Sequence, residues 1–394
     1  MKRLLLSIIC FFSIYFGFSQ RILLSDDAKI SVLTVGPGTS LYDAFGHNAF
    51  RIQDKNKRID LTFGYGEYDF DDPNFYVKFA QGKLNYLLSQ IRYANFYNYY
   101  ISQNRTIDEQ VLNLSQDQQQ ALFNYLLTNY KPENRRYLYD FFYDNCATRM
   151  RDVTKIAIKD SIGFNVPSDF QQKTFRNLIH DHVNRNSWGS FGIDLALGSV
   201  VDRPASSYEY MFLPKYIHDF FAEAQLSNGE SLVTSSQQIY KSSRTSNRST
   251  FFLSPLFILG LVSLLIIYIT YQDNQLDKRS KWMDVSIFAI TGIAGIIMLL
   301  LWFATDHTAT AHNYNLLWAF PLNLIVLFPL LKSVVHVRVV KYIKLLVILL
   351  CLLCLHWMVG VQVYAIGLIP ILIALVIRYV FLIRYFNKQL ESAA

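Results

Sequence analysis

The residue most suited to catalysis by its type and position is Cys146, in the stretch YDFFYDNCATRMRDV. The other cysteines are Cys10, near the N-terminus, and Cys351 and Cys354, inside an apolar run where we expect packing rather than redox or metal chemistry. Asn145 is a good helix N-cap, so Cys146 is predicted in the first turn of a helix. There the backbone N–H groups and the helix dipole favour a thiolate nucleophile. The alternative is a buried structural cysteine.

A cysteine nucleophile needs a base, usually a histidine. In the first 250 residues, His180 and His182 are predicted to be solvated at a helix end, and His218 to pack on an apolar helix. His47 lies in GHNAFRI, which together with IDLTF after DKNK indicates two strands joined by a tight turn. We therefore expect His47 to be the base. If DKNK closes the hairpin, Tyr65 is predicted to face His47 and to orient its ring.

The chain from residue 251 to 394 is dominated by apolar runs close to the length of about 20 residues that crosses a bilayer. The five predicted spans are about 251–271, 284–304, 315–331, 342–359 and 361–382. Lys and Arg gather in alternate loops, which predicts that those loops and the C-terminus are cytoplasmic. The protein is thus expected in a bacterial inner membrane, with residues 21–250 on the periplasmic side.

The N-terminal region agrees with that topology. Residues 1–20 have a charged start, an apolar run and small residues before a predicted cleavage near Gln20, as in a secretory signal peptide, with an uncleaved anchor as the alternative. Residues 21–248 carry 25 Lys and Arg and 25 Asp and Glu, so the net charge of +7 lies beside the apolar runs. That placement argues against a nucleic-acid partner. Residues 226–250 are rich in Ser and Thr and are predicted to be a polar linker.

A strand histidine that precedes a helix-start cysteine is the order found in circularly permuted papain-like enzymes of the lecithin:retinol acyltransferase group, whose motifs resemble GHNAFRI and DNCATRM. The sequence also resembles the Lnb family of bacterial lipoprotein N-acyltransferases. The stretches that carry this resemblance are DAFGHNAFRI (43–52), FDDPNFYVKFAQGKLNYLLS (70–89), YDFFYDNCATRMRD (139–152), GIDLALGSVVDRPASSYEYMFLP (192–214) and TDHTATAHNYNLLWAFPLN (305–323). The resemblance implies an α+β fold, with a circularly permuted papain-like periplasmic domain over 21–225. An all-α transmembrane domain of five helices would follow over 251–394.

The resemblance implies that a phospholipid donates an acyl chain to Cys146 as a thioester, with His47 as the base. The α-amine of a diacylglyceryl-cysteine lipoprotein would then accept the chain, and no cofactor or resident metal is implied. The rival readings are an exported papain-like cysteine peptidase or amidase acting on peptidoglycan, and a non-catalytic membrane scaffold in which Cys146 only packs. Five spans favour the acyltransferase, because a soluble polymer substrate needs no such partner.

Three further residues are predicted to bind substrate. Arg149 follows Cys146 by one helical step and could meet a lipid phosphate, although an ion pair with Asp144 or Asp152 is the simpler reading. For His307 and His312, in the loop TDHTATAHNYN, we predict hydrogen bonds to a lipid headgroup rather than metal ligation.

Overall fold

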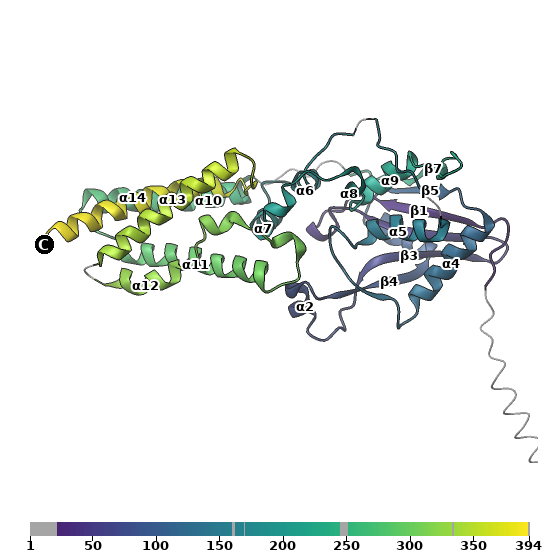
Figure 1. Cartoon of the computed structure of the whole chain (residues 1–394), viewed down its shortest axis with the longest axis horizontal. Coiled ribbons are helices and arrows are strands. Elements are labelled where there is room, and N and C mark those ends of the chain that lie inside the picture. Colours follow the sequence, from purple (N-terminus) through teal and green to yellow (C-terminus); the bar gives the residue numbers. More distant parts are fainter. Residues whose placement is uncertain (1–21, 160–161, 169, 245–250, 333–334, 393–394) are drawn as a thin grey trace, which may run out of the picture.

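The computed structural model describes residues 22–159, 162–168, 170–244, 251–332 and 335–392, so the predicted signal peptide at 1–20 lies outside the described residues. A domain built on a β-sheet, here called the sheet domain (22–240), is followed by a bundle of long helices, the helical domain (251–392). The two lie end to end (Figure 1). This mixed fold followed by helices confirms the coarse prediction. The papain-like permutation stays a prediction.

The sheet has seven strands, and every neighbouring pair is antiparallel. In chain order they are β1 (Lys29–Val35), β2 (His47–Asp54), β3 (Ile59–Tyr68), β4 (Asn85–Arg92), β5 (Ile107–Leu112), β6 (Arg136–Leu138) and β7 (Val233–Tyr240). Their order across the sheet is β6-β4-β3-β2-β1-β5-β7. The edge strand β7 lies inside the segment 226–250 that was predicted to be a linker, so the sheet continues past residue 225.

The helices of the sheet domain cover both faces of the sheet. They are α2 (Phe75–Gln81), α3 (Tyr93–Ser102), α4 (Gln116–Tyr130), α5 (Cys146–Ile158), α6 (Phe175–His180), α7 (Trp188–Ala196), α8 (Ser207–Tyr210) and α9 (Pro214–Ala222), with 3-10 turns η1 (Leu41–Asp43) and η2 (Ser199–Val201). Alternate strand residues point to opposite faces. Phe50 and Phe63 join the large core with α4 and α5, whereas Ala49 joins a smaller core with Phe96 of α3.

Helix α5 begins at Cys146, as predicted. The Asn145 side-chain oxygen accepts hydrogen bonds from the N–H groups of Ala147 (2.8 Å) and Thr148 (2.9 Å). The Thr148 hydroxyl in turn accepts from the Asn145 N–H at 2.8 Å, which completes a capping box. Met150 is fully buried against the sheet, so the cap and the apolar face together fix where the cysteine stands.

The helical domain contains four helices that are long and apolar enough to cross a membrane, among the described residues. Its elements are η3 (Phe251–Leu253), α10 (Pro255–Gln275), α11 (Lys281–Phe303), η4 (Thr308–Thr310), η5 (Tyr314–Leu317), α12 (Asn323–Leu331), α13 (Val337–Met358) and α14 (Leu368–Ser392). Four of the five predicted spans are thus long helices. The third, 315–331, is not a continuous helix.

The third span is interrupted by polar and cyclic residues. Pro321 cannot donate a backbone hydrogen bond, and α12 starts only after it, with 9 residues. The Asn323 side chain is buried and bonded: its amide donates to the Thr291 hydroxyl (2.7 Å), and its oxygen accepts from the Tyr342 hydroxyl (2.6 Å). A polar group placed this way is satisfied by the neighbouring helices, which is how a broken helix persists inside a bundle.

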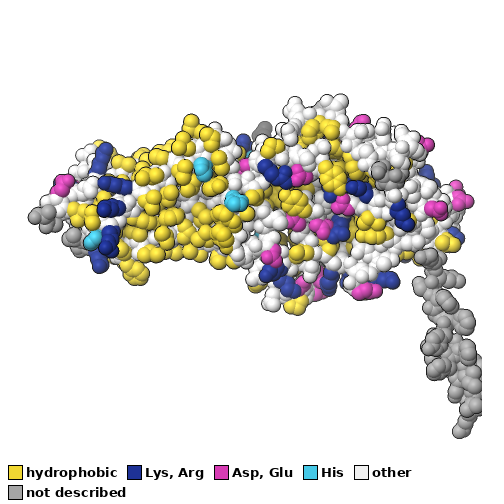
Figure 2. All heavy atoms as spheres, in the orientation of Figure 1, with side chains coloured by type: hydrophobic (Ala, Val, Ile, Leu, Met, Phe, Trp, Pro, Cys, Tyr) yellow, Lys and Arg dark blue, Asp and Glu magenta, His cyan; other side chains and the backbone are white. Residues whose placement is uncertain are grey.

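Charged residues inside the helical domain are paired. Arg378 is fully buried and contacts Asp284 (2.7 Å) and Asp273 (2.8 Å). Figure 2 shows hydrophobic side chains over most of this domain and Lys and Arg side chains gathered near its free end. The ion pairs of Arg378 with Asp273 and Asp284 are what a charge inside a membrane requires.

Candidate active site

Cys146 lies at the N-terminal end of α5 and is half-buried. The backbone N–H groups of Asn48, Ala147 and Cys146 act to lower the pKa of the Cys146 thiol. Burial nevertheless outweighs these donors and raises the pKa of the Cys146 thiol to about 11. The helix start thus lowers the pKa of the thiol as expected, but burial has the larger effect, so the net shift favours a neutral thiol over the expected thiolate.

His47 is the first residue of β2 and is half-buried on the face of the sheet that α3 covers. Its ring stacks on Tyr100 of α3, with 6.2 Å between the ring centroids. Burial, with a smaller contribution from the positive charge of Arg105, lowers the pKa of His47 to about 4. The imidazole is therefore neutral at physiological pH and can accept a proton.

Both side chains lie beside residues 64–66 of β3. A Cβ added at Gly64 would stand 3.2 Å from His47 Nε2, and one added at Gly66 would stand 3.9 Å from Cys146 Cβ. Gly66 has a φ of +97°, and the pairing of β3 with β4 is irregular between Tyr65 and Glu67. A bulge of this kind with glycine at positive φ is common next to functional sites, and here it places the Gly66 backbone beside Cys146.

Tyr65 does not face His47, so its predicted orienting role is wrong. The hairpin pairs Ala49 with Gly64, one residue away from the expected register, which turns Tyr65 to the opposite face of the sheet. There its hydroxyl donates to the side chain of Asn129 in α4 at 2.6 Å.

Aromatic residues that sequence reasoning missed surround the thiol. Tyr137 Oη would be 3.9 Å from a Cβ at Gly66, and the Tyr139 ring would be 3.7 Å from it. The Tyr137 hydroxyl is buried, and no described residue forms a hydrogen bond with it. The nearby charge of Glu67 adds to the raised pKa of Cys146, after burial. The only sequence signal was the Gly-Tyr-Gly of β3, which marks a bulge.

Arg149 follows the thiol on α5, but its guanidinium is already engaged. Its Nε and Nη2 donate to the two carboxylate oxygens of Asp144 at 2.5 and 2.6 Å. The same group lies over the ring of Tyr137, 4.6 Å from its centroid. The ion pair with Asp144 is thus the simpler of the two alternatives for Arg149, and its contact with a lipid phosphate stays a prediction.

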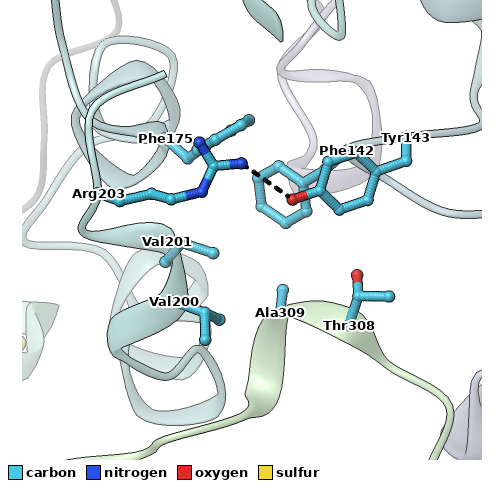
Figure 3. Close-up of a pocket in the computed structure, with 8 residues that line it drawn as sticks. All are labelled: Phe142, Tyr143, Phe175, Val200, Val201, Arg203, Thr308 and Ala309. Atoms are coloured by element: carbon cyan, nitrogen blue, oxygen red, sulfur yellow. Dashed lines mark hydrogen bonds between the residues drawn. The ribbon is translucent and has the colours of Figure 1, made fainter. Parts of the chain in front are cut away.

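A cavity of about 350 Å³ lies between the sheet domain and the loop that follows α11 (Figure 3). Its lining residues are Phe142, Tyr143, Phe175, Val200, Val201, Arg203, Thr308 and Ala309. Phe142 and Tyr143 lie three and two residues before Asn145, the cap of α5, so the cavity adjoins the segment that leads to the thiol. Arg203 donates to the Tyr143 hydroxyl at 3.4 Å and is the one charged lining residue.

The loop that carries His307 and His312 is held against the sheet domain rather than free. The Asp306 N–H donates to the Gln81 carbonyl (2.8 Å), and a Cβ at Gly82 would stand 2.9 Å from the His307 nitrogen. His312 is exposed, and its ring centroid lies 5.2 Å from that of Trp302. The two histidines do not line the cavity, and their role in headgroup binding stays a prediction.

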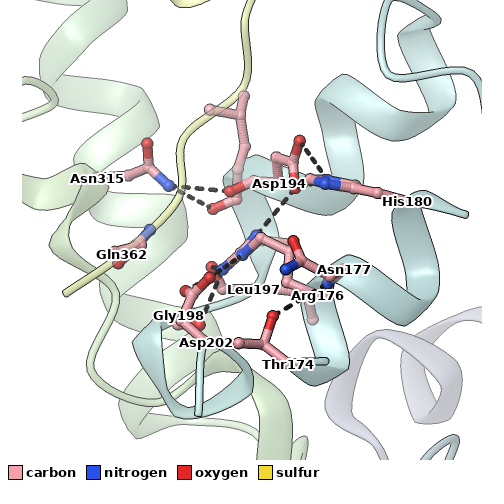
Figure 4. A network of polar contacts seen from close by, with 12 residues as sticks. Thr174, Arg176, Asn177, His180, Asp194, Leu197, Gly198, Asp202, Asn315 and Gln362 are labelled. Carbon is pink, nitrogen blue, oxygen red and sulfur yellow. Dashed lines mark hydrogen bonds and ion pairs between the residues drawn. The ribbon is translucent and has the colours of Figure 1, made fainter. Parts of the chain in front are cut away.

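A buried ionic network, here called the junction network (Arg176, His180, Asp194 and Asp202), lies where the two domains meet (Figure 4). Arg176 is fully buried. Its Nη1 donates to Asp194 at 2.9 Å and its Nε to Asp202 at 2.8 Å. His180 Nε2 lies 2.9 Å from the same Asp194 carboxylate.

The helical domain binds the segment that this network organises. The side-chain amide of Asn315 donates to the Asp194 carbonyl at 3.1 Å, and that of Asn313 donates to the Leu195 carbonyl at 2.7 Å. The Gly198 N–H donates to the Ala309 carbonyl at 2.9 Å. The sheet domain is therefore fixed on the helical domain by buried directional bonds, a link that no local sequence pattern predicted.

Two family models match the chain. One, described as the Lnb N-terminal periplasmic domain, matches residues 18–180, and the other, described as the Lnb transmembrane domain, matches residues 246–390. No curated protein and no solved structure matches significantly. The first matched segment contains His47 and Cys146. The second contains the four long apolar helices except the last two residues of α14. The chain belongs to the Lnb family.

Proposed function

We propose that this protein is a lipoprotein N-acyltransferase of the bacterial inner membrane. It moves an acyl chain from a phospholipid, through a thioester on Cys146, to the α-amine of a diacylglyceryl-cysteine lipoprotein. The supporting observation is a helix-start thiol and a neutral imidazole on either side of residues 64–66, in a domain fixed on membrane-spanning helices. A thiol, a base and direct access to lipid are what such a reaction needs.

In the first step His47 takes the thiol proton while Sγ bonds to the carbonyl carbon of a phospholipid ester. The C–O bond of the ester then breaks, and the imidazolium returns the proton to the departing lysophospholipid oxygen. Because the thiol starts neutral, with its pKa raised to about 11, His47 acts as a general base rather than as the partner of a preformed thiolate. General base catalysis contributes about 10²–10⁴-fold.

In the second step the lipoprotein amine attacks the thioester carbon. The C–N bond forms, the C–S bond breaks, and His47 transfers the amine proton to the departing sulfur, which regenerates the thiol. In both steps negative charge develops on the carbonyl oxygen, which needs donors. We assign this role to the Cys146 N–H and to the Tyr137 hydroxyl, which has no described partner and lies beside Gly66.

The orientation follows from charge. Lys and Arg gather at the end of the helical domain that lies away from the sheet domain (Figure 2), which favours a cytoplasmic C-terminus. Residues 1–20 would then act as the export signal, and the domain over 21–225 with its strand β7 would stand in the periplasm. Cys146 would then be on the side of the membrane that holds both lipid-modified substrates.

The decisive test combines a variant with a chemical trap. Cys146→Ala should abolish N-acylation, judged by mass spectrometry of lipoproteins, while membrane insertion and thermal unfolding stay unchanged. The parent protein, incubated with labelled phospholipid, should acquire a label that hydroxylamine removes, and Cys146→Ala should not. Full complementation by Cys146→Ala would favour a scaffold. Altered muropeptides with normal N-acylation would favour a peptidoglycan peptidase or amidase.

A further inference from the structure

The segment around α2 exposes large apolar side chains. Phe70 is 72% exposed, Tyr76 81%, Val77 56% and Phe79 48%. None of the α2 residues is buried, so this short helix gives little to the core of its own domain. A group of exposed aromatic and aliphatic side chains on one segment marks an interaction surface. We call residues 68–81 the aromatic flap.

The position of the flap indicates that its partner is the lipid bilayer. The Gln81 carbonyl at its C-terminal end accepts the Asp306 N–H at 2.8 Å, and α11 ends at Phe303, only three residues earlier. Figure 1 accordingly places α2 beside the sheet-domain end of α11. The flap is therefore held at the level where a membrane-spanning helix leaves the bilayer, the depth at which Tyr and Phe partition favourably.

Two of the three aspartates of the flap, Asp69 and Asp72, are paired with basic side chains. Asp72 forms an ion pair with Lys78 of α2, and Asp69 accepts a hydrogen bond from Arg136 at 2.7 Å. This pairing lowers the electrostatic cost of approaching a leaflet with anionic lipids.

A series of aromatic rings in contact connects the flap with the thiol. Tyr68 lies 6.0 Å from Phe75 and 4.9 Å from Tyr86, measured between ring centroids. Tyr86 stacks on Tyr139 at 4.1 Å, and the Tyr139 ring borders the same space at Gly66 as Cys146 does. A continuous series of aromatic contacts therefore joins the flap to the space beside Cys146.

We propose that the aromatic flap inserts into the periplasmic leaflet and that the rings of Tyr68, Tyr86 and Tyr139 guide the phospholipid acyl ester to Cys146. The proposal rests on the acyl transfer proposed above. The ester carbonyl of a phospholipid sits at the boundary of headgroup and acyl chain, which is the level at which the flap is proposed to insert.

Insertion can be tested without any activity measurement. In the full chain reconstituted in nanodiscs, Tyr76→Trp adds a fluorophore to the flap, and Lys57→Trp adds one to the exposed turn at the opposite end of the hairpin from His47. After subtraction of the parent spectrum, brominated phospholipid should quench the tryptophan at position 76 and leave the one at position 57 unquenched. Equal absence of quenching at both positions would overturn the proposal.

Donor delivery is tested with two donors. The double variant Phe70→Ser with Tyr76→Ser should transfer acyl chains from bilayer phospholipid about tenfold more slowly than the parent. Its rate with a water-soluble short-chain thioester donor should equal that of the parent. An equal loss with both donors, or no loss with either, would contradict the guiding role. Activity that survives Cys146→Ala would refute the acyl-transfer chemistry itself, whatever the quenching result.

Discussion

The junction network and the candidate active site both bury polar groups, but they satisfy them in different ways. At the junction, Arg176 meets Asp194 and Asp202, and its third nitrogen donates to the carbonyl of Gly198 at 3.0 Å. At the site, Cys146 and His47 are kept neutral by burial.

The Tyr137 hydroxyl beside them is buried with no hydrogen bond to any described residue. An unmade hydrogen bond in a buried place costs stability, and proteins retain such groups mainly where they act on a ligand or reaction. Each charged group of the junction network thus has a partner of opposite charge. The Tyr137 hydroxyl, in contrast, is available to a substrate beside Cys146.

The largest effect is expected from breaking the junction network. Arg176→Met leaves two carboxylates buried without their cation, which should lower the free energy of unfolding by about 3–5 kcal/mol. The measurement is thermal unfolding in detergent, followed by near-ultraviolet circular dichroism.

The matched control for this variant is Lys215→Met. Lys215 forms an exposed ion pair with Asp219 one turn away in α9, and such a pair contributes less than about 1 kcal/mol. If the free energy of unfolding fell equally in the two variants, the junction network would not stabilise the protein more than an exposed ion pair does.

The junction also shows where sequence reasoning ends. Asn145 and the apolar spacing of α5 are local signals, so the helix start at Cys146 could be predicted. The contacts of Asn313 and Asn315 with α7 join residues more than a hundred positions apart. No local pattern in either segment predicts that the two lie together. Strand β7 is equally non-local, because its mostly polar sequence forms a strand only by pairing with β5.

The candidate site could be predicted as far as local patterns allowed. His47 on a strand and Cys146 on a helix were expected. The third residue was not found, because a slip of one position in the hairpin turned Tyr65 to the opposite face. The raised pKa of Cys146 also could not be predicted, since desolvation depends on the packing around the helix end.

The next prediction sharpens the comparison by measuring ionisation at the site. The pKa of Cys146 is raised from 9.0 to about 11, so the folded protein binds a proton that the unfolded chain releases between these values. Alkylation of the folded protein by iodoacetamide should therefore increase through about pH 11, with the Cys146→Ser rate subtracted. The contribution of this group to stability should be complete below pH 9 and disappear as the pH rises through 11. A midpoint near pH 7 would indicate a thiolate–imidazolium pair instead.

Changes at two tyrosines that lie on either side of strand β4, Tyr137 on β6 and Tyr65 on β3, separate the effects on rate and on stability. Tyr137→Phe removes the proposed oxyanion donor and should lower kcat by about 10²-fold. The free energy of unfolding should not fall, because the hydroxyl has no described partner to lose.

Tyr65→Phe is the opposite case. It removes the 2.6 Å bond to Asn129, so the free energy of unfolding should fall by about 1 kcal/mol while kcat stays at the parent value. Rate assays together with thermal melts separate the two variants. A loss of kcat in Tyr65→Phe alone would restore Tyr65 as the orienting residue and remove Tyr137 from the mechanism.

The smallest effect is expected from adding a methyl group at Gly64, which tests whether the position of the His47 ring matters for catalysis. A methyl group in Gly64→Ala would stand 3.2 Å from His47 Nε2 and 3.4 Å from Ser89 Oγ, so the ring must shift by a few tenths of an ångström. We expect kcat to fall about tenfold, because proton transfer depends on such distances. The control is Gly192→Ala in α7, where an added Cβ meets nothing within 4 Å. That change should raise helix stability by about 0.5–1 kcal/mol and leave kcat unaltered. If Gly64→Ala also leaves kcat unaltered, His47 either moves freely or takes no part in the proton transfer.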